Sequence, residues 1–354
     1  MNPAPTRYRE VHVSGSPREM GRQIGDAVGE QVRGFCQQAL EHVNRTVAVT
    51  SELADAVVRD SLSAAEQYSP EMVQELRGVA EASGVTLQQV MLLQVRNQFT
   101  EGMDHACTAL SLAPRATLSG SALVAQNWDN DPALDEFTIV LTRRPTGKPA
   151  IMNVTQAGLI SYLGFNAAGI GVCVNTLPAP SRPAGVPHYF TLRGVYEATC
   201  LEDAVAAIRR ARRAIPANMM MATPQGPANL EITIDDVHVL RDSQALTHTN
   251  HCLHPELHAV NDQFPELIES HPRKRRIDAL LLDAGEMFSL EQVKAVLSDH
   301  QDFPRSICRH PNDDPRFGFM TSVFSIIIDV EQGAMHVTRG NPCSQPYETY
   351  QLSD

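Results

Sequence analysis

The chain has 354 residues, of which 43% are hydrophobic and 20% charged, which is enough for one large domain or two medium ones with an ample core. Its formal net charge of -12 excludes general binding to nucleic acids or anionic membranes, because both need a net basic surface. No window approaches the roughly 18 apolar residues of a membrane-spanning helix, and residues 1–15 lack the apolar stretch of a signal peptide.

Residues 16–100 are predicted to be helical. Ser16-Pro17 and Ser69-Pro70 have helix-start chemistry, with serine as the cap and proline in the first turn. Thr86 is predicted to cap the last of these helices, whose apolar positions indicate burial. The predicted helices cover the amphipathic segments 27–45 and 53–67, a segment from 69 to 84, and residues 86–99.

From Thr108 to Asn250, short β-branched runs alternate with turn signals, which predicts strands. The predicted strands are 121–128, 137–143, 150–155, 170–176, 229–234 and 237–249, with a helical stretch at about 190–213 among them. Helices are predicted near 272–283 and 289–299, and a hairpin of 323–329 and 334–339 follows them. This order predicts sheets covered by helices, with no linker that marks a second domain.

The seven cysteines are odd in number, widely spread and never in a CxxC pair, which is typical of reduced thiols in a cytoplasm. We expect six of them to be small buried hydrophobic residues. Cys107 lies where predicted helix gives way to predicted strand. As an N-terminal residue it would have a base in its own α-amine, whose pKa lies near neutrality. On the local pattern alone, a buried cysteine at the start of a strand is the simpler interpretation.

Asp129 ends the motif Gln126-Asn127-Trp128-Asp129, about twenty residues after Cys107. A strand out and a strand back would bring Asp129 beside Cys107, where its carboxylate would orient an ammonium group. The alternative is structural, with residues 127–132 forming a turn and Trp128 lying in the core.

A third polar cluster, residues 247–254, ends a predicted strand. The amide of Asn250 would donate to a developing oxyanion, and a preorganised donor of this kind contributes about 2.7–4 kcal/mol. The alternative is a metal site. Its potential ligands are His248, His251, Cys252, His254 and His258, although Pro255 interrupts any helix and there is no HExxH motif.

Two further patterns are interpreted as structural. The glycine-rich segment 164–171 does not follow the dinucleotide-binding pattern and is predicted to be a turn between strands. The basic run Arg273-Lys274-Arg275-Arg276 is predicted to begin a solvated helix face, with phosphate binding as the alternative.

Several segments, taken in order, form a specific set although each alone is a weak signal. They are residues 93–97, 106–108, 126–129, 158–160, 164–169, 185–187, 248–253, 306–309 and 323–327. In this order they resemble the acyl-coenzyme A:6-aminopenicillanic acid acyltransferase family of N-terminal-nucleophile (Ntn) enzymes. The resemblance runs over most of the chain.

The resemblance implies an α+β fold, a four-layer αββα sandwich of two antiparallel sheets flanked by helices. It also implies an inactive precursor that cleaves itself between Ala106 and Cys107. The products would be a mainly helical α chain, 1–106, and a catalytic β chain, 107–354, which stay associated as one domain.

By the same resemblance, Cys107 would be the nucleophile with its freed amine as base, Asp129 its acidic partner and Asn250 the oxyanion donor. Substrate-binding or oxyanion roles are assigned to Asn175, Gln126 and Thr108. Asn175 is placed by analogy with bile-salt and penicillin V hydrolases, and a core asparagine in a strand is the alternative there.

The sequence departs from the family pattern at Ala106, where the family has glycine, and at His105, where it has aspartate. A Cβ at position 106 restricts the backbone strain available for self-cleavage, so slower processing is expected. Near Gly318-Phe319-Met320 the penicillin enzyme has a Ser-Arg pair that this sequence lacks, with Arg316 the nearest basic residue. Penicillin acylation is therefore not expected.

The expected function is hydrolysis of a small N-acylated amine or amino-acid derivative through an acyl-thioester on Cys107. Two alternatives stay open: acyl transfer to an amine, with coenzyme A thioester as donor, and an unprocessed, non-catalytic binding protein. No metal or other cofactor is expected. The expected partners are the small-molecule substrate and the two chains of one precursor, with homo-oligomers possible and without nucleic acid or membrane.

Overall fold

The computed structural model describes residues 5–100, 106–267 and 269–353. Its N-terminal part is the helical region predicted from the sequence. The helices are α1 (Pro17–Asn44), α2 (Ser51–Tyr68), α3 (Pro70–Ser83) and α4 (Leu87–Phe99). Thr86 Oγ1 accepts from the backbone N–H of Gln89, and Gln89 Oε1 accepts from that of Thr86, a capping box that fixes the start of α4.

An eight-stranded sheet lies against these helices. Its strands, in spatial order, are β1 (Glu10–Gly15), β4 (Thr138–Pro145), β5 (Ile151–Gln156), β6 (Leu163–Asn166), β7 (Gly171–Asn175), β8 (Ala217–Ala222), β9 (Ala228–Ile232) and β10 (Val237–Arg241). All neighbours pair antiparallel except β1 and β4, which are parallel.

A second sheet has six strands. In spatial order they are β11 (Ala245–His248), β2 (Ala106–Leu112), β3 (Leu123–Asn130), β12 (Thr321–Asp329), β13 (Ala334–Val337) and β14 (Glu348–Gln351). Every pair in it is antiparallel. The two sheets face each other, and Ser111 Oγ on β2 donates to the carbonyl oxygen of Met221 on β8 across the interface.

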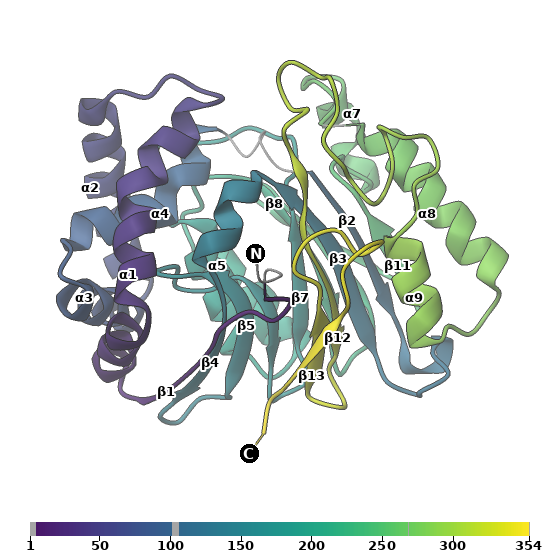
Figure 1. Cartoon of the computed structure of the whole chain (residues 1–354), viewed down its shortest axis with the longest axis horizontal. Coiled ribbons are helices and arrows are strands. Elements are labelled where there is room, and N and C mark those ends of the chain that lie inside the picture. The colour runs from purple at the N-terminus through teal and green to yellow at the C-terminus, as the bar shows by residue number, and fades with distance from the viewer. Residues whose placement is uncertain (1–4, 101–105, 268, 354) are drawn as a thin grey trace.

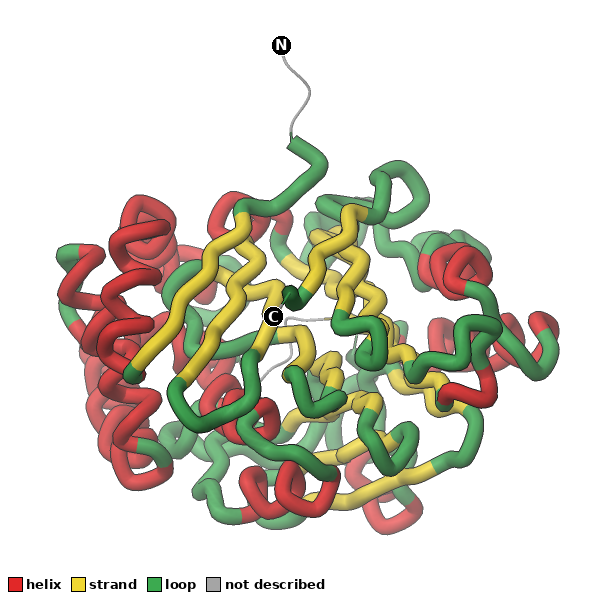
Figure 2. Tube along the Cα trace, turned by 90° about the horizontal axis from the view of Figure 1, so that it is seen from below, coloured by secondary structure: helices red, strands yellow, loops and turns green. Residues whose placement is uncertain are grey.

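Helices cover the outer face of each sheet. α1 packs on β1 and β4, while α8 (Ser270–Ala284) packs on β2 and β11, and α9 (Leu290–Leu297) on β3. Figure 1 shows α1–α4 on one side of the sheets and α8 and α9 on the other, and Figure 2 shows the strands in the middle from below. This arrangement confirms the predicted α+β class and its four αββα layers.

Two expectations about local structure were wrong. The helix predicted at 190–213 is two helices, α5 (His188–Tyr196) and α6 (Leu201–Arg209), separated by a turn. The strand predicted at 237–249 is β10 and β11, which belong to different sheets. The glycine-rich segment 164–171 was predicted to be a turn between strands, and its residues 167–169 do form the turn that joins β6 to β7. The segment also includes the end of β6, where Gly164 lies so close to the Met152 carbonyl that a Cβ would meet it at 2.0 Å.

The core fills the space between the sheets and beneath the helices. In the described part of the chain, no helix combines the length and apolar character needed to cross a membrane. Four of the six cysteines expected to be buried are buried, while Cys200 is half-buried and Cys343 is exposed. None of the seven forms a disulfide.

Candidate active site

Cys107 lies near the start of β2, which pairs with β11 on one side and β3 on the other in the six-stranded sheet. Its partner on β3 is Trp128, and Ala106 pairs with Asp129. The two strands form an antiparallel hairpin, which confirms the expected path of the chain from Cys107 to Asp129. The motif that was alternatively interpreted as a turn is strand as far as Asn130. Trp128 lies in the core, stacked on Phe324 with ring centroids 4.9 Å apart.

The Cys107 thiol is buried, with 1% of the residue exposed. Burial first, and then the negative charge of Asp129, raise the pKa of the thiol to about 12. The opposing influences are the positive charge of Arg273, the Gln126 side chain and the backbone N–H of Asp129. The thiol is therefore protonated near neutral pH and needs a base before it can attack a carbonyl.

The backbone around Cys107 is held by Asn250. The backbone N–H of Cys107 donates to Asn250 Oδ1 across 3.0 Å, and Arg273 Nη2 donates to the same oxygen across 2.8 Å. Two donors at one atom fix the orientation of the amide, because only its oxygen accepts. Asn250 Nδ2 donates to the carbonyl oxygen of Thr176 across 3.1 Å, which leaves one N–H of that group for a second acceptor.

Arg273 is a site residue that sequence reasoning missed. It was expected on a solvated helix face, whereas its side chain is fully buried on α8. Its Nη1 donates to the Cys107 carbonyl oxygen across 2.6 Å and to Thr108 Oγ1 across 2.9 Å. A signal was available, because Arg273 and the buried Ile277 are four residues apart and share one face of a helix.

Asp129 is also fully buried. Its Oδ1 accepts a hydrogen bond of 2.6 Å from Ser322 Oγ on β12, and its Oδ2 has no hydrogen-bond partner within the described ranges. Burial raises the pKa of this carboxyl to about 6, against the opposing effects of Arg273, Ser322 and Arg309. A carboxyl with this pKa exchanges protons near neutral pH, which suits a general base.

The remaining predicted residues lie around the same point. Thr108 Oγ1 accepts the hydrogen bond from Arg273 given above. The Gln126 side chain contacts the Cys107 thiol, and its Nε2 donates to the Val174 carbonyl oxygen across 2.8 Å. Asn175 Nδ2 donates to the Thr249 carbonyl oxygen across 2.7 Å, which ties β7 to the segment that carries Asn250.

A cavity of about 20 Å³, enough for one water molecule, adjoins Cys107. Asn175, Thr176 and His188 belong to its lining. The structure thus places the six predicted site residues next to one another, while His105 lies outside the described residues.

The histidines of the 247–254 cluster face separate partners. His248 packs beneath the site, where Nε2 lies 2.9 Å from Glu231 Oε1 and Nδ1 donates to the Thr249 carbonyl oxygen. His251 Nδ1 contacts Ser270 Oγ, and Cys252 Sγ faces the Pro178 carbonyl oxygen. Among the described residues, the five proposed ligands form no common group.

Comparisons with known proteins match the chain to one family and to a relative of similar length. The model of a family described as acyl-coenzyme A:6-aminopenicillanic acid acyl-transferase matches residues 116–343. The 40 kDa form of acyl-coenzyme A:6-aminopenicillanic-acid-acyltransferase from Emericella nidulans is 28% identical over 349 residues, 97% of this chain and 96% of that protein.

Two solved structures are also similar. A penicillin V acylase from Agrobacterium tumefaciens matches with a TM-score of 0.47 and 10% identity, over 70% of this chain and 86% of that one. A mutant conjugated bile acid hydrolase from Clostridium perfringens matches with a TM-score of 0.44 and 12% identity, over 70% and 97%.

Proposed function

Because the chain belongs to the acyl-coenzyme A:6-aminopenicillanic acid acyl-transferase family, we propose that it is a self-processing cysteine amidohydrolase acting on a small N-acylated amine or amino-acid derivative. The observation that carries the proposal is the hydrogen bond from the Cys107 backbone nitrogen to Asn250 Oδ1. Processing would turn this nitrogen into the α-amine, and Asn250 would then hold it beside the thiol.

The first step is cleavage of the chain. Asp129 takes the proton of the Cys107 thiol, and the sulfur attacks the carbonyl carbon of Ala106. The peptide C–N bond breaks as its nitrogen takes the proton back, which leaves a thioester between Ala106 and Cys107. Water hydrolyses this thioester, releasing the Ala106 carboxylate and a free Cys107 with thiol and α-amine.

Substrate hydrolysis repeats this chemistry. The α-amine takes the thiol proton, the sulfur adds to the substrate carbonyl, and the second N–H of Asn250 Nδ2 donates to the oxyanion. The leaving amine receives the proton as the C–N bond breaks, and an acyl-thioester forms on Cys107. A water molecule, deprotonated by the α-amine, then attacks the thioester and releases the acid.

Intact-mass measurement of the purified protein under denaturing conditions tests the proposal. The expected masses are those of residues 1–106 and 107–354 for the wild type, and that of one uncut chain for Cys107→Ala. Cys200→Ser, which alters a half-buried cysteine far along the chain, serves as the matched control and should be cut normally. An uncut wild-type chain that shows no thiol-dependent acyl exchange would identify a binding protein instead.

A second function, acyl transfer, is favoured by the relative from Emericella nidulans, whose name is that of an acyltransferase and which matches almost the whole chain. In this reaction an amine attacks the same thioester in place of water. Incubation of the processed enzyme with a coenzyme A thioester and increasing concentrations of an amine separates the two. Hydrolysis predicts a constant yield of free acid, whereas transfer predicts amide that increases with the amine.

A further inference from the structure

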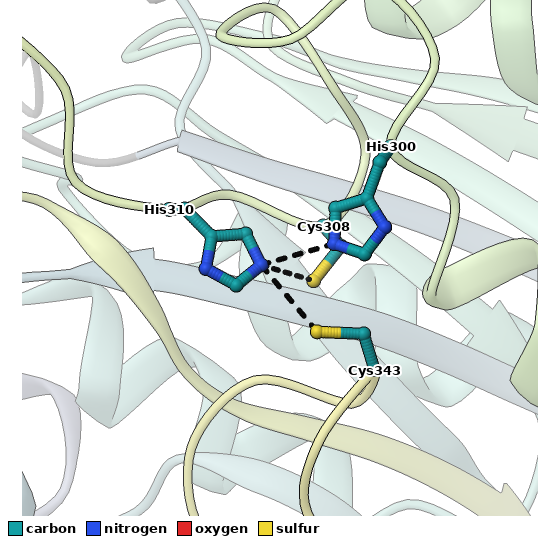
Figure 3. Close-up of side chains that lie close together, drawn as sticks. All are labelled: His300, Cys308, His310 and Cys343. Atoms are coloured by element: carbon teal, nitrogen blue, oxygen red, sulfur yellow. Dashed lines mark hydrogen bonds between the residues drawn. The ribbon is translucent and has the colours of Figure 1, made fainter.

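A group of four side chains lies apart from the candidate active site, in the loops that follow α9 and β13. Its members are His300, Cys308, His310 and Cys343 (Figure 3). Each offers one ligand atom, and these atoms all lie within 4.8 Å of one another. The group joins two stretches of chain that are separated by β12 and β13.

The contacts converge on one atom. His310 Nε2 lies 3.0 Å from His300 Nε2, 3.5 Å from Cys308 Sγ and 3.4 Å from Cys343 Sγ (Figure 3). A ring nitrogen carries either one hydrogen or one lone pair in the ring plane, so it makes one good hydrogen bond and not three. Three neighbours at this range are better explained by four ligands directed at a common centre.

We propose that His300, Cys308, His310 and Cys343 bind a zinc ion. Zinc bonds of roughly 2.0–2.1 Å to nitrogen and 2.3 Å to sulfur, in a tetrahedron, separate the ligand atoms by roughly 3.3–3.8 Å. At His310 Nε2 the two distances to sulfur, 3.5 and 3.4 Å, lie within this range, and the 3.0 Å distance to His300 Nε2 lies just below it. Small side-chain rotations therefore complete the site. Two thiolates and two imidazoles, with no carboxylate, favour zinc over calcium or magnesium.

Four protein ligands fill a tetrahedral zinc site, which makes this a structural and not a catalytic centre. Its surroundings agree with that role. Asn341 Nδ2 lies 3.6 Å from Cys308 Sγ as a donor, the kind of second contact that orients a zinc thiolate. The same nitrogen donates to the Arg309 carbonyl oxygen across 2.6 Å, so the loop that carries Cys343 already contacts the loop that carries Cys308.

The position of the group connects it to Asp129. The backbone N–H of Arg309, the residue after Cys308, donates to Ser322 Oγ across 3.0 Å. Ser322 Oγ in turn donates to Asp129 Oδ1 across 2.6 Å. An ion that fixes Cys308 would therefore hold Ser322 and the Asp129 carboxyl in place without touching the substrate.

The spacing of these ligands explains why the sequence did not reveal them. Cys343 lies 33 residues after His310, and β12 and β13 stand between them in the sequence. No pair among the four ligands has the short spacing of a zinc ribbon or zinc finger. The expectation of no metal rested on the absence of such a pattern. Only the folded loops bring Cys343 to the other three.

The test is the metal content of the full chain, purified without a polyhistidine tag or chelator and measured by inductively coupled plasma mass spectrometry. We expect one zinc per chain in the wild type and a loss of at least tenfold in Cys343→Ser and in His300→Gln. Both altered side chains are exposed, so these variants should fold, as circular dichroism will show. Cys200→Ser and His12→Gln, outside the group, should keep the zinc.

Cobalt substitution gives an independent result. Co²⁺ added to the zinc-free chain should produce the intense visible bands of a tetrahedral site and a thiolate-to-cobalt charge-transfer band, and both should be lost in Cys343→Ser. Equal zinc in the wild type and Cys343→Ser would overturn the proposal. So would a zinc-free wild type whose intact mass shows a Cys308–Cys343 disulfide. The zinc content is also measured on the Cys107→Ala chain, which is expected to stay uncut. A failure of the zinc proposal can therefore be told apart from a failure of the proposed catalysis.

Discussion

Arg273 Nη1 on α8 donates a hydrogen bond to the carbonyl oxygen of Cys107 on β2, across 2.6 Å of space and 166 residues of sequence. The same guanidinium reaches Thr108 and Asn250. One buried cation thus fixes the peptide plane after the candidate nucleophile and the amide that faces its nitrogen. It also sets the local charge, because Arg273 counters the rise in the pKa of Asp129.

Arg273→Lys should slow both self-cleavage and turnover by about 100-fold, because one ammonium group cannot make three hydrogen bonds in the fork geometry of arginine. Rates of chain cleavage from a mass time course, together with kcat on an N-acylated amine, measure the effect. Arg275→Gln, which alters an exposed member of the same basic run, is the control and should leave both rates unchanged. Equal rates for the two variants would show that the Arg273 hydrogen bonds do not contribute to self-cleavage or turnover.

Asp129 should make the stability of the uncut chain depend on pH. Burial raises its pKa from an ordinary 3.8 to about 6, so its neutral form is the one the fold prefers, and stability is lost as pH rises through this range. The shift corresponds to about 3 kcal/mol. In a Cys107→Ala background, Asp129→Asn should therefore raise the free energy of unfolding by about 3 kcal/mol above about pH 7, and by little below about pH 4.

Urea unfolding of the two single-chain proteins at several pH values measures this difference. Asparagine keeps an acceptor for Ser322, so the change isolates the charge. A difference in stability that is the same at all pH values would contradict the raised pKa.

Glu75 on α3 lies in a buried ion-pair network that joins the helical layer to the eight-stranded sheet. Its Oε1 is 2.7 Å from Arg143 Nε on β4, and its Oε2 is 3.0 Å from Arg193 Nη1 on α5. Although burial acts to raise it, Arg193 and Arg143 hold the pKa of Glu75 below its usual value. Glu75→Gln should destabilise the chain by about 3–5 kcal/mol, because two buried guanidinium groups lose their counter-charge.

Chemical denaturation of the uncut Cys107→Ala chain measures that loss. Glu71→Gln is the matched control on the same helix, since Glu71 forms an exposed pair with Lys148 and should cost less than about 1 kcal/mol. Similar losses for both would indicate that the network adds nothing beyond surface pairing.

Ala106→Gly should accelerate self-cleavage. Ala106 is fully buried at the start of β2, and its Cβ restricts the backbone by about 0.5–1 kcal/mol relative to glycine, which corresponds to about two- to fivefold in rate. The time course of cleavage after cell-free synthesis gives the rates. Ala109→Gly weakens the same strand elsewhere and should not accelerate cleavage; a matching increase there would attribute the effect to general loosening of β2.

Local signals determined much of the helical layer. Serine and threonine caps, proline in first turns and Gly84 in a left-handed conformation at the end of α3 all act within one helical turn, so the sequence locates α1 to α4 closely. The hairpin of β2 and β3 was also predictable, because a short connection joins strands that pair directly. That hairpin brings Cys107 and Asp129 together, and the prediction of their proximity needed no distant part of the chain.

Only the tertiary structure decided which charged and polar residues join them. Residues 237–249 look like one continuous strand, yet the chain crosses there from one sheet to the other and carries Asn250 to Cys107. Arg273 stands in a run of basic residues whose members differ only in which face of α8 they occupy. The burial of Arg273 depends on its acceptors, and two of them, on Cys107 and Thr108, lie more than 160 residues away in the sequence. Cys343 likewise meets His310 only because two loops, 33 residues apart in the sequence, lie together in the fold. Sequence periodicity reports local geometry, whereas the burial of a charge is fixed by partners that only the complete fold supplies.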